Sequence, residues 1–192
     1  MKNSFGITNE DLDVLLDINN FTNEDLDVLL DINNFTNEDI DRLRQLQSVI
    51  EAKLPALTER FYVQLQNNET TAVFLEGRLE ALKATHLQWM KDLFTREFNE
   101  EYVAFLWNIG RVHAKLHIAP LFVAASMSFL RSEIPSIISE EIAGSLGKNR
   151  ADLIASVLKI LDINQFVIDS SYNDRLLEVT GISKKLLQRL MG

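Results

Sequence analysis

The stretch FLWNIGRVHAKLHIAP, residues 105–120, decides the fold. It lies within a helix that we predict over residues 99–117, in which large side chains recur every three or four positions and therefore share one face. That face comprises Tyr102, Leu106, Ile109, His113 and Leu116. His113 thus points inward, and from this face alone a core histidine bonded to a carbonyl group is the simpler interpretation.

A second histidine occupies the same kind of position on another helix, predicted over residues 78–96. The apolar face of this helix comprises Leu79, Leu82, His86, Trp89 and Leu93. Two of the three histidines of the chain are therefore expected to be buried. Because a buried imidazole without a hydrogen bond costs free energy, two such rings suggest a shared partner. Haem would supply one, since its iron takes imidazole ligands and its ring packs against apolar side chains.

Other chemistry has weaker support in the sequence. His113 and His117 are spaced so that both could bind zinc from one helical turn, but no glutamate follows His113 and no third ligand is evident nearby. No nucleophile elbow, glycine-rich phosphate loop or inward-facing pair of acids is found, so we expect no enzyme activity in this chain.

Composition favours one helical domain. The 192 residues include only seven glycines and three prolines, and few segments alternate between apolar and polar residues. Cysteine is absent, which excludes disulfides and thiolate chemistry. The net charge of −9 argues against nucleic-acid binding. No secretory signal is recognisable, and the longest nearly apolar stretch, residues 118–130, is too short to span a membrane. We therefore expect a cytoplasmic location and no membrane partner.

The N-terminal region contains a perfect repeat. TNEDLDVLLDINNF occurs at residues 8–21 and again at 22–35, and a third, degenerate copy begins at residue 36. A calcium loop is an alternative, but the ligand and glycine spacing of an EF-hand are missing. We interpret the repeat as a duplicated amphipathic helix, with Thr as N-cap and Asn-Asn as the stop. Residues 1–36 are thus expected to form an acidic extension that packs on the domain or is loosely tethered to it.

The remaining chain is predicted to form consecutive helices separated by NNET, EFNE and SLGKN. Their expected ranges are residues 37–50, 53–67, 70–76, 78–96, 99–117, 120–141 and 149–175. We place the main domain at residues 37–175 and interpret residues 176–192 as the start of a linker to an output domain.

Three segments together resemble a known family. LTERFYVQL (58–66), LEALKATHLQWMKDLF (79–94) and the stretch at 105–120 are similar, in this order and spacing, to the globin domain of the globin-coupled sensors. These are haem-based gas sensors of bacteria and archaea, related to protoglobins. The resemblance implies an all-α, globin-like helical sandwich, here with an N-terminal helical extension.

The resemblance also assigns roles to residues. It implies that haem b is bound with His113 as the proximal iron ligand and that the Tyr62 hydroxyl faces the bound gas. The other implied pocket positions are Phe61, Leu82, Thr85, Trp89 and Ile109. Two positions depart from the family: His117 replaces a common glycine, and His86 stands where many members have an aliphatic residue. We therefore hypothesise a bis-histidyl resting haem, with His86 displaced when gas binds.

The family's partners follow from the same resemblance. They are a diatomic gas (oxygen, nitric oxide or carbon monoxide), a second copy that pairs through the last two helices, and a linked or separate output domain; redox state is an alternative signal. Two other functions remain open. One is a non-haem, globin-like interaction module of a stress-signalling scaffold, and the other is oxygen storage or haem-dependent redox chemistry.

Overall fold

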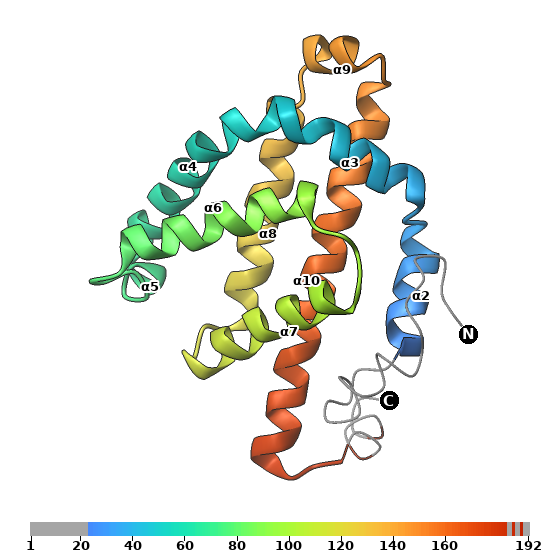
Figure 1. Ribbon diagram of the computed structural model, residues 1–192. Coiled ribbons are helices and arrows are strands. Elements are labelled where there is room, and N and C mark those ends of the chain that lie inside the picture. The colour runs from blue at the N-terminus through green and yellow to red at the C-terminus, as the bar shows by residue number, and fades with distance from the viewer. Residues whose placement is uncertain (1–22, 184–185, 187–188, 190–192) are drawn as a thin grey trace. The chain divides into compact units, whose positions relative to one another are not determined.

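The computed structural model describes residues 23–183, 186 and 189, and every regular element among them is a helix (Figure 1). The all-α prediction is therefore confirmed. In chain order the elements are α2 (Asn23–Asn33), α3 (Asn37–Ile50), η1 (Glu51–Lys53), α4 (Leu54–Asn67), α5 (Glu69–Ala72), α6 (Leu79–Thr95), α7 (Glu100–Lys115), α8 (Pro120–Ile137), α9 (Glu140–Leu146) and α10 (Arg150–Thr180). The first repeat copy, at residues 8–21, lies outside the described residues.

The predicted breaks occur where polar or left-handed residues cap the helices. The Asn68 side chain accepts hydrogen bonds from the backbone N–H groups of Thr70 and Thr71, and Asn99 accepts one from Tyr102. Gly147 ends α9 in the left-handed conformation, with φ of 62°. The breaks NNET, EFNE and SLGKN are thus confirmed.

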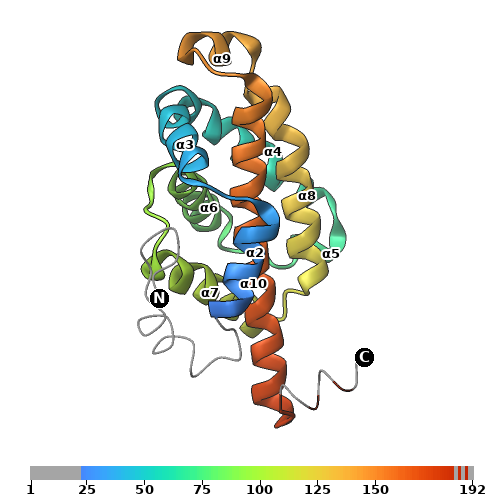
Figure 2. The same cartoon turned by 90° about the vertical axis from the view of Figure 1, so that its right-hand side faces the viewer.

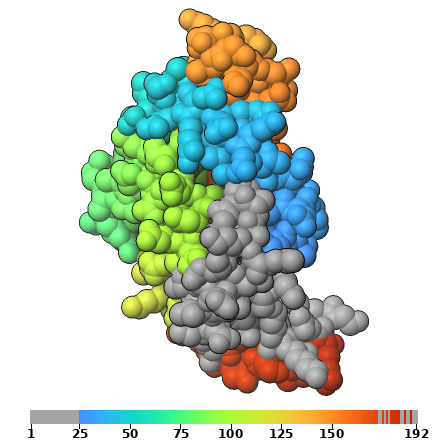
Figure 3. Space-filling view, turned by 45° about the vertical axis from the view of Figure 1, so that its right-hand side comes forward, coloured from blue at the N-terminus to red at the C-terminus, as the bar shows by residue number. Residues whose placement is uncertain are grey.

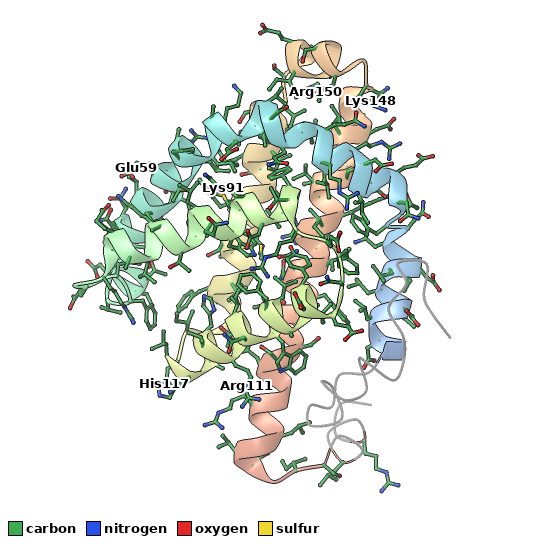
Figure 4. All side chains as sticks on the ribbon, viewed as in Figure 1. Glu59, Lys91, Arg111, His117, Lys148 and Arg150 are labelled. Carbon is green, nitrogen blue, oxygen red and sulfur yellow. The ribbon has the colours of Figure 1, made fainter. Side chains whose placement is uncertain are left out.

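The prediction of one helix over residues 120–141 is wrong. Pro135 lies in the last turn of α8, where its ring removes a backbone donor, and the helix ends at Ile137. Ser139 then starts α9 by accepting a hydrogen bond from the Ile142 N–H group. Arg150, labelled in Figure 4, donates to the backbone carbonyls of Ile138 and Pro135 and so satisfies the end of α8.

Helix α10 extends to Thr180 rather than to the predicted residue 175, and Gly181, with φ of 68°, follows it. No single helix among the described residues is long and apolar enough to cross a membrane. Only α8 and α9 taken together, bent by 69°, reach the required length and composition.

The chain divides into two compact units, one of which comprises Phe35–Arg96 and Leu121–Asp162. Within this unit α6 packs against both α3 and α4. α8 and the first part of α10 lie side by side (Figure 2), and Arg131 donates to Asp162 at 2.8 Å between these helices. Helix α9 stands beyond α3 at one end of the unit (Figure 3).

A buried carboxylate, Asp39, stabilises this unit at the start of α3. Its oxygens accept hydrogen bonds from Ser156 Oγ at 2.7 Å, Lys159 Nζ at 3.0 Å and the Thr36 backbone N–H at 2.9 Å. Burial alone would raise the pKa of Asp39, but these hydrogen bonds outweigh it and lower the pKa below 3.8. The third repeat start, TNED at residues 36–39, thus links α3 to α10.

Within the described residues, the other unit comprises residues 23–34, Glu97–Pro120 and the chain from Ile163 onward. Its described part holds α2, α7 and the second part of α10. Leu26 and Leu30 of α2 are buried, as expected for one face of the second repeat copy. Val28 and Ile32 on the same helix are exposed. The amphipathic character predicted for the repeat is therefore incomplete, because two apolar residues face solvent.

Helix α7 is fixed to α10 at three levels. The buried side chains of Tyr102 and Asn164 bond to each other through hydroxyl and amide groups. At Gly110 the two backbones approach so closely that an added Cβ would lie 2.5 Å from the Ile168 carbonyl oxygen and nearer still to Ser171 Oγ. Beyond the end of α7, the Tyr172 hydroxyl donates to the Ile118 carbonyl at 2.8 Å.

Candidate functional site

His86 lies in the middle of α6, and its imidazole stacks with two aromatic rings. Phe61 of α4 stacks on it with ring centroids 4.6 Å apart and an interplanar angle of 26°. Trp89, one turn further along α6, stacks at 5.3 Å with the same angle of 26°. Both rings are buried. The apolar face predicted for this helix therefore places His86 in an aromatic stack.

Tyr62 completes this group from α4. Its ring meets His86 edge-on, at 5.7 Å and 78°. Burial raises the pKa of Tyr62 to about 12, so the hydroxyl stays protonated and can donate a hydrogen bond at neutral pH. Leu82 packs against the same apolar cluster, which Phe61, Tyr62 and Leu75 form.

The His86 ring is neutral, and one of its nitrogen atoms has no hydrogen-bond partner. Its Nδ1 atom is buried and has no hydrogen-bond partner. Desolvation lowers the pKa of His86 to about 4, because no nearby acceptor stabilises the charged form. An imidazole in this state can act as a metal ligand, since coordination requires the neutral ring.

His113 lies near the end of α7 and has a different environment. Its Nδ1 is 2.7 Å from the carbonyl oxygen of Ile109. Because a carbonyl only accepts, Nδ1 carries the proton and Nε2 keeps its lone pair. Burial lowers the pKa of His113, and the hydrogen bond from its ring to Ile109 only partly opposes that shift. The carbonyl partner expected of a core histidine is present, and it leaves the other nitrogen available for coordination.

His117 completes the turn after α7. It has a positive φ of 58°, the conformation that favours glycine, which the resemblance led us to expect at this position. The N–H groups of Ile118 and His117 donate to the carbonyls of His113 and Ala114, respectively, which is the Schellman pattern. The exposed His117 side chain points away from the helices (Figure 4). His117 is therefore placed as a helix-ending residue.

The structure brings most of the expected pocket residues of one unit together. Phe61, Tyr62, Leu82, His86 and Trp89 form one group. Thr85 does not join it, because the residue is exposed and its hydroxyl donates to the Ala81 carbonyl of its own helix. In the other unit, Ile109 contributes its carbonyl oxygen to His113.

Two further contacts that position His113 were not identified from the sequence. The first is the close approach at Gly110, which lies three residues before His113. The second is the bond between Tyr102 and Asn164, residues 62 positions apart. Gly110, a small residue among bulky ones in its helix, could have indicated the first contact. No local sequence feature indicates that Tyr102 pairs with Asn164.

The available ligands fit haem better than a bare metal ion. Within the described ranges, no three histidine or acidic side chains are grouped so that they could hold a metal. A bare ion needs three or four protein ligands, whereas haem iron needs one or two because the porphyrin supplies the rest. His86 in one unit and His113 in the other each offer a neutral imidazole that could serve as such a ligand.

Comparisons with known proteins agree with this chemistry. The family model named Protoglobin matches residues 22–178, a range that includes the second repeat copy. The globin domain of a globin-coupled sensor from Geobacter sulfurreducens is similar in structure, with a TM-score of 0.67 and 29% identity. The match covers 76% of this chain and 96% of that domain.

A curated relative, the "Heme-based aerotactic transducer HemAT" of Halobacterium salinarum, is 25% identical over 138 residues. The match covers 67% of this chain but only 28% of the transducer. The expected globin-like fold is thus confirmed. The matched proteins are a sensor domain and a signalling protein, and neither is described as an enzyme.

Proposed function

The chain belongs to the protoglobin family, and on that premise we propose that it is the haem-binding globin domain of a gas or redox sensor. The observation that carries the proposal is the state of His113. Its Nδ1–H is bonded to the Ile109 carbonyl, which fixes the tautomer and leaves Nε2 as a neutral ligand. His113 would hold the haem as the proximal ligand. When bound, haem b would supply an iron that accepts imidazole ligands and reversibly binds a diatomic gas.

We assign the resting second ligand to His86, which gives a bis-histidyl haem. Its ring is neutral and stacks with apolar aromatic side chains, as a haem ligand would require. Gas would then compete with an internal ligand, so the apparent gas affinity would equal the intrinsic affinity multiplied by the fraction of protein in which His86 is released. The protonated Tyr62 hydroxyl beside His86 can donate a hydrogen bond to an incoming gas ligand.

The contacts of α7 suggest how ligand binding leads to a signal. His113 is carried by a helix that is fixed to α10 through Tyr102, Gly110 and Ile118. A shift of α7 therefore has to be followed by α10, which is the long last helix of the described chain. We propose that α10 passes this shift to a second copy, through a dimer of the last two helices, and to a linked or separate output domain in the cytoplasm.

An interaction module without haem is the second candidate. It is favoured by one observation: Phe61 and Trp89 already stack on the His86 ring, as core side chains would. In that function, both histidines would be structural and the domain would act as a scaffold.

Absorption spectra of the purified chain, before and after addition of hemin, separate the two candidates. We expect a Soret band and a low-spin ferric spectrum that shifts on reduction and on addition of carbon monoxide. Hemin addition that leaves free-hemin absorption unchanged would contradict the sensor and favour the scaffold. The His113→Ala variant serves as the matched control, since it removes the proposed proximal ligand.

A further inference from the structure

The way in which the His86 ring is held differs from the usual support of a histidine ligand. A ligating imidazole normally donates its second N–H to an acceptor, which fixes the ring and strengthens the ligand. His113 has such an acceptor in the Ile109 carbonyl, whereas the buried Nδ1 of His86 has none. Its orientation must therefore come from another source.

Stacking provides that source. The imidazole makes two stacked contacts, one with the Phe61 ring and one with the Trp89 ring, each at an interplanar angle of 26°. Rotation of the ring about its Cβ–Cγ bond would break both stacked arrangements at once. The Tyr62 ring, which meets His86 edge-on, adds a further steric limit. The stacked rings thus restrict the plane of the imidazole.

We propose that Phe61 and Trp89 are positioning residues that clamp His86 by stacking alone, so that His86 would serve as a haem ligand whose bond to iron is easily exchanged. The inference rests on the proposed bis-histidyl haem. The missing Nδ1 partner makes His86 a weaker ligand than His113, because no acceptor increases the electron density of its ring. His86 would therefore be the ligand that is released more easily, and its return to the iron would depend on the clamp.

The clamp can be tested without haem. In the haem-free protein, proton NMR should show the carbon-bound protons of the His86 ring shifted by the ring currents of the two neighbours. Trp89→Leu and Phe61→Leu should each reduce that shift, and Trp89→Phe should largely keep it. Phe129→Leu is the matched control, because Phe129 contacts Phe61 in the same group but has no stacking contact with His86.

The same variants are then loaded with hemin and examined by absorption and resonance Raman spectroscopy. Freeing one restrained side chain costs about 1 kcal/mol of preorganisation, so the ratio of six- to five-coordinate haem should fall about fivefold in Trp89→Leu and Phe61→Leu. Carbon monoxide should bind correspondingly faster. Trp89→Phe and Phe129→Leu should behave as the wild type.

The possible outcomes distinguish the clamp on His86 from the bis-histidyl haem on which that proposal rests. A five-coordinate ferrous wild type overturns the bis-histidyl haem and the clamp together. A six-coordinate wild type that becomes five-coordinate in His86→Ala, but is unchanged in both leucine variants, overturns the clamp alone. Absence of a ring-current shift in the haem-free wild type also overturns it. If Trp89→Leu does not fold, Phe61→Leu and the haem-free spectrum still decide.

Discussion

His113 and His86 lie on helices with similar sequence patterns, yet they are held by opposite means. His113 is fixed through the backbone: its ring bonds to the Ile109 carbonyl, and its helix is fixed to α10 at Gly110. His86 is held by the faces of Phe61 and Trp89, and its Nδ1 has no partner. The difference teaches that an inward position on a helix does not define a ligand. We propose that the surrounding contacts make His113 a permanent ligand and His86 an exchangeable one.

The largest expected effect comes from breaking the backbone support of His113. In Gly110→Ala the new methyl group meets the Ile168 carbonyl, which cannot rotate away, so α7 must move off α10. We expect a loss of about 3 kcal/mol in the free energy of unfolding, measured with urea, because backbone atoms cannot rotate aside to make room for the added methyl group. Haem content should fall with it.

The matched control is Gly144→Ala in α9, where an added Cβ meets nothing within 4 Å. This variant should gain about 0.5 kcal/mol, since alanine is the better helix former. Equal stabilities of the two alanine variants would show that the crossing at Gly110 does not support α7 as described.

A smaller loss in the free energy of unfolding should follow removal of the buried charge in the unit that contains His86. Asp39→Asn deprives Lys159 and Ser156 of a charged acceptor, and we expect a loss of about 2 kcal/mol at pH 7. Because the folded-state pKa of Asp39 lies below its unfolded value of 3.8, its contribution is present above that value and disappears as pH falls through the folded-state pKa.

Urea titrations between pH 7 and pH 2 check this sign. The stability difference between wild type and Asp39→Asn should shrink in the acid range. A constant difference across that range would mean that the charge of Asp39 contributes nothing, and that only its shape matters.

The smallest effect concerns the turn that ends the helix of His113. His117→Gly removes the strain of a left-handed histidine, so the free energy of unfolding should rise by about 1 kcal/mol. Asn34→Gly is the control, since Asn34 also has a positive φ, of 51°, but asparagine tolerates this conformation better and should gain less. A thermal shift that is larger for Asn34→Gly would contradict this explanation.

Most helix boundaries could be predicted because local residues determine them. Asn68, Asn99 and Gly147 cap helices through their own side chains or backbone freedom, and the predicted range 37–50 matches α3. The break between α8 and α9 was missed, although Pro135 and the pair Ser139–Glu140 mark it in the sequence. It depends partly on Arg150, which is distant in sequence and satisfies the freed carbonyls.

The candidate site was predictable to the level of helix faces. The spacing of apolar residues predicted that His86 and His113 lie on the buried faces of their helices. It could not identify the rings that stack on His86, because Phe61 belongs to another helix. The apolar face predicted for residues 78–96 already omitted Thr85, which is exposed; only the family resemblance placed Thr85 in the pocket. Contacts between helices depend on how the helices cross, and periodicity within one helix carries no information about that.

Ferric and ferrous absorption spectra of hemin-loaded wild type, His86→Ala and His113→Ala test the central claim most directly, that His113 is the permanent ligand and His86 the exchangeable one. We predict a six-coordinate, low-spin wild type, a five-coordinate ferrous His86→Ala variant that keeps its haem, and a His113→Ala variant that loses most of it. A wild-type spectrum unchanged by His86→Ala, or haem retained equally in both variants, would contradict the account.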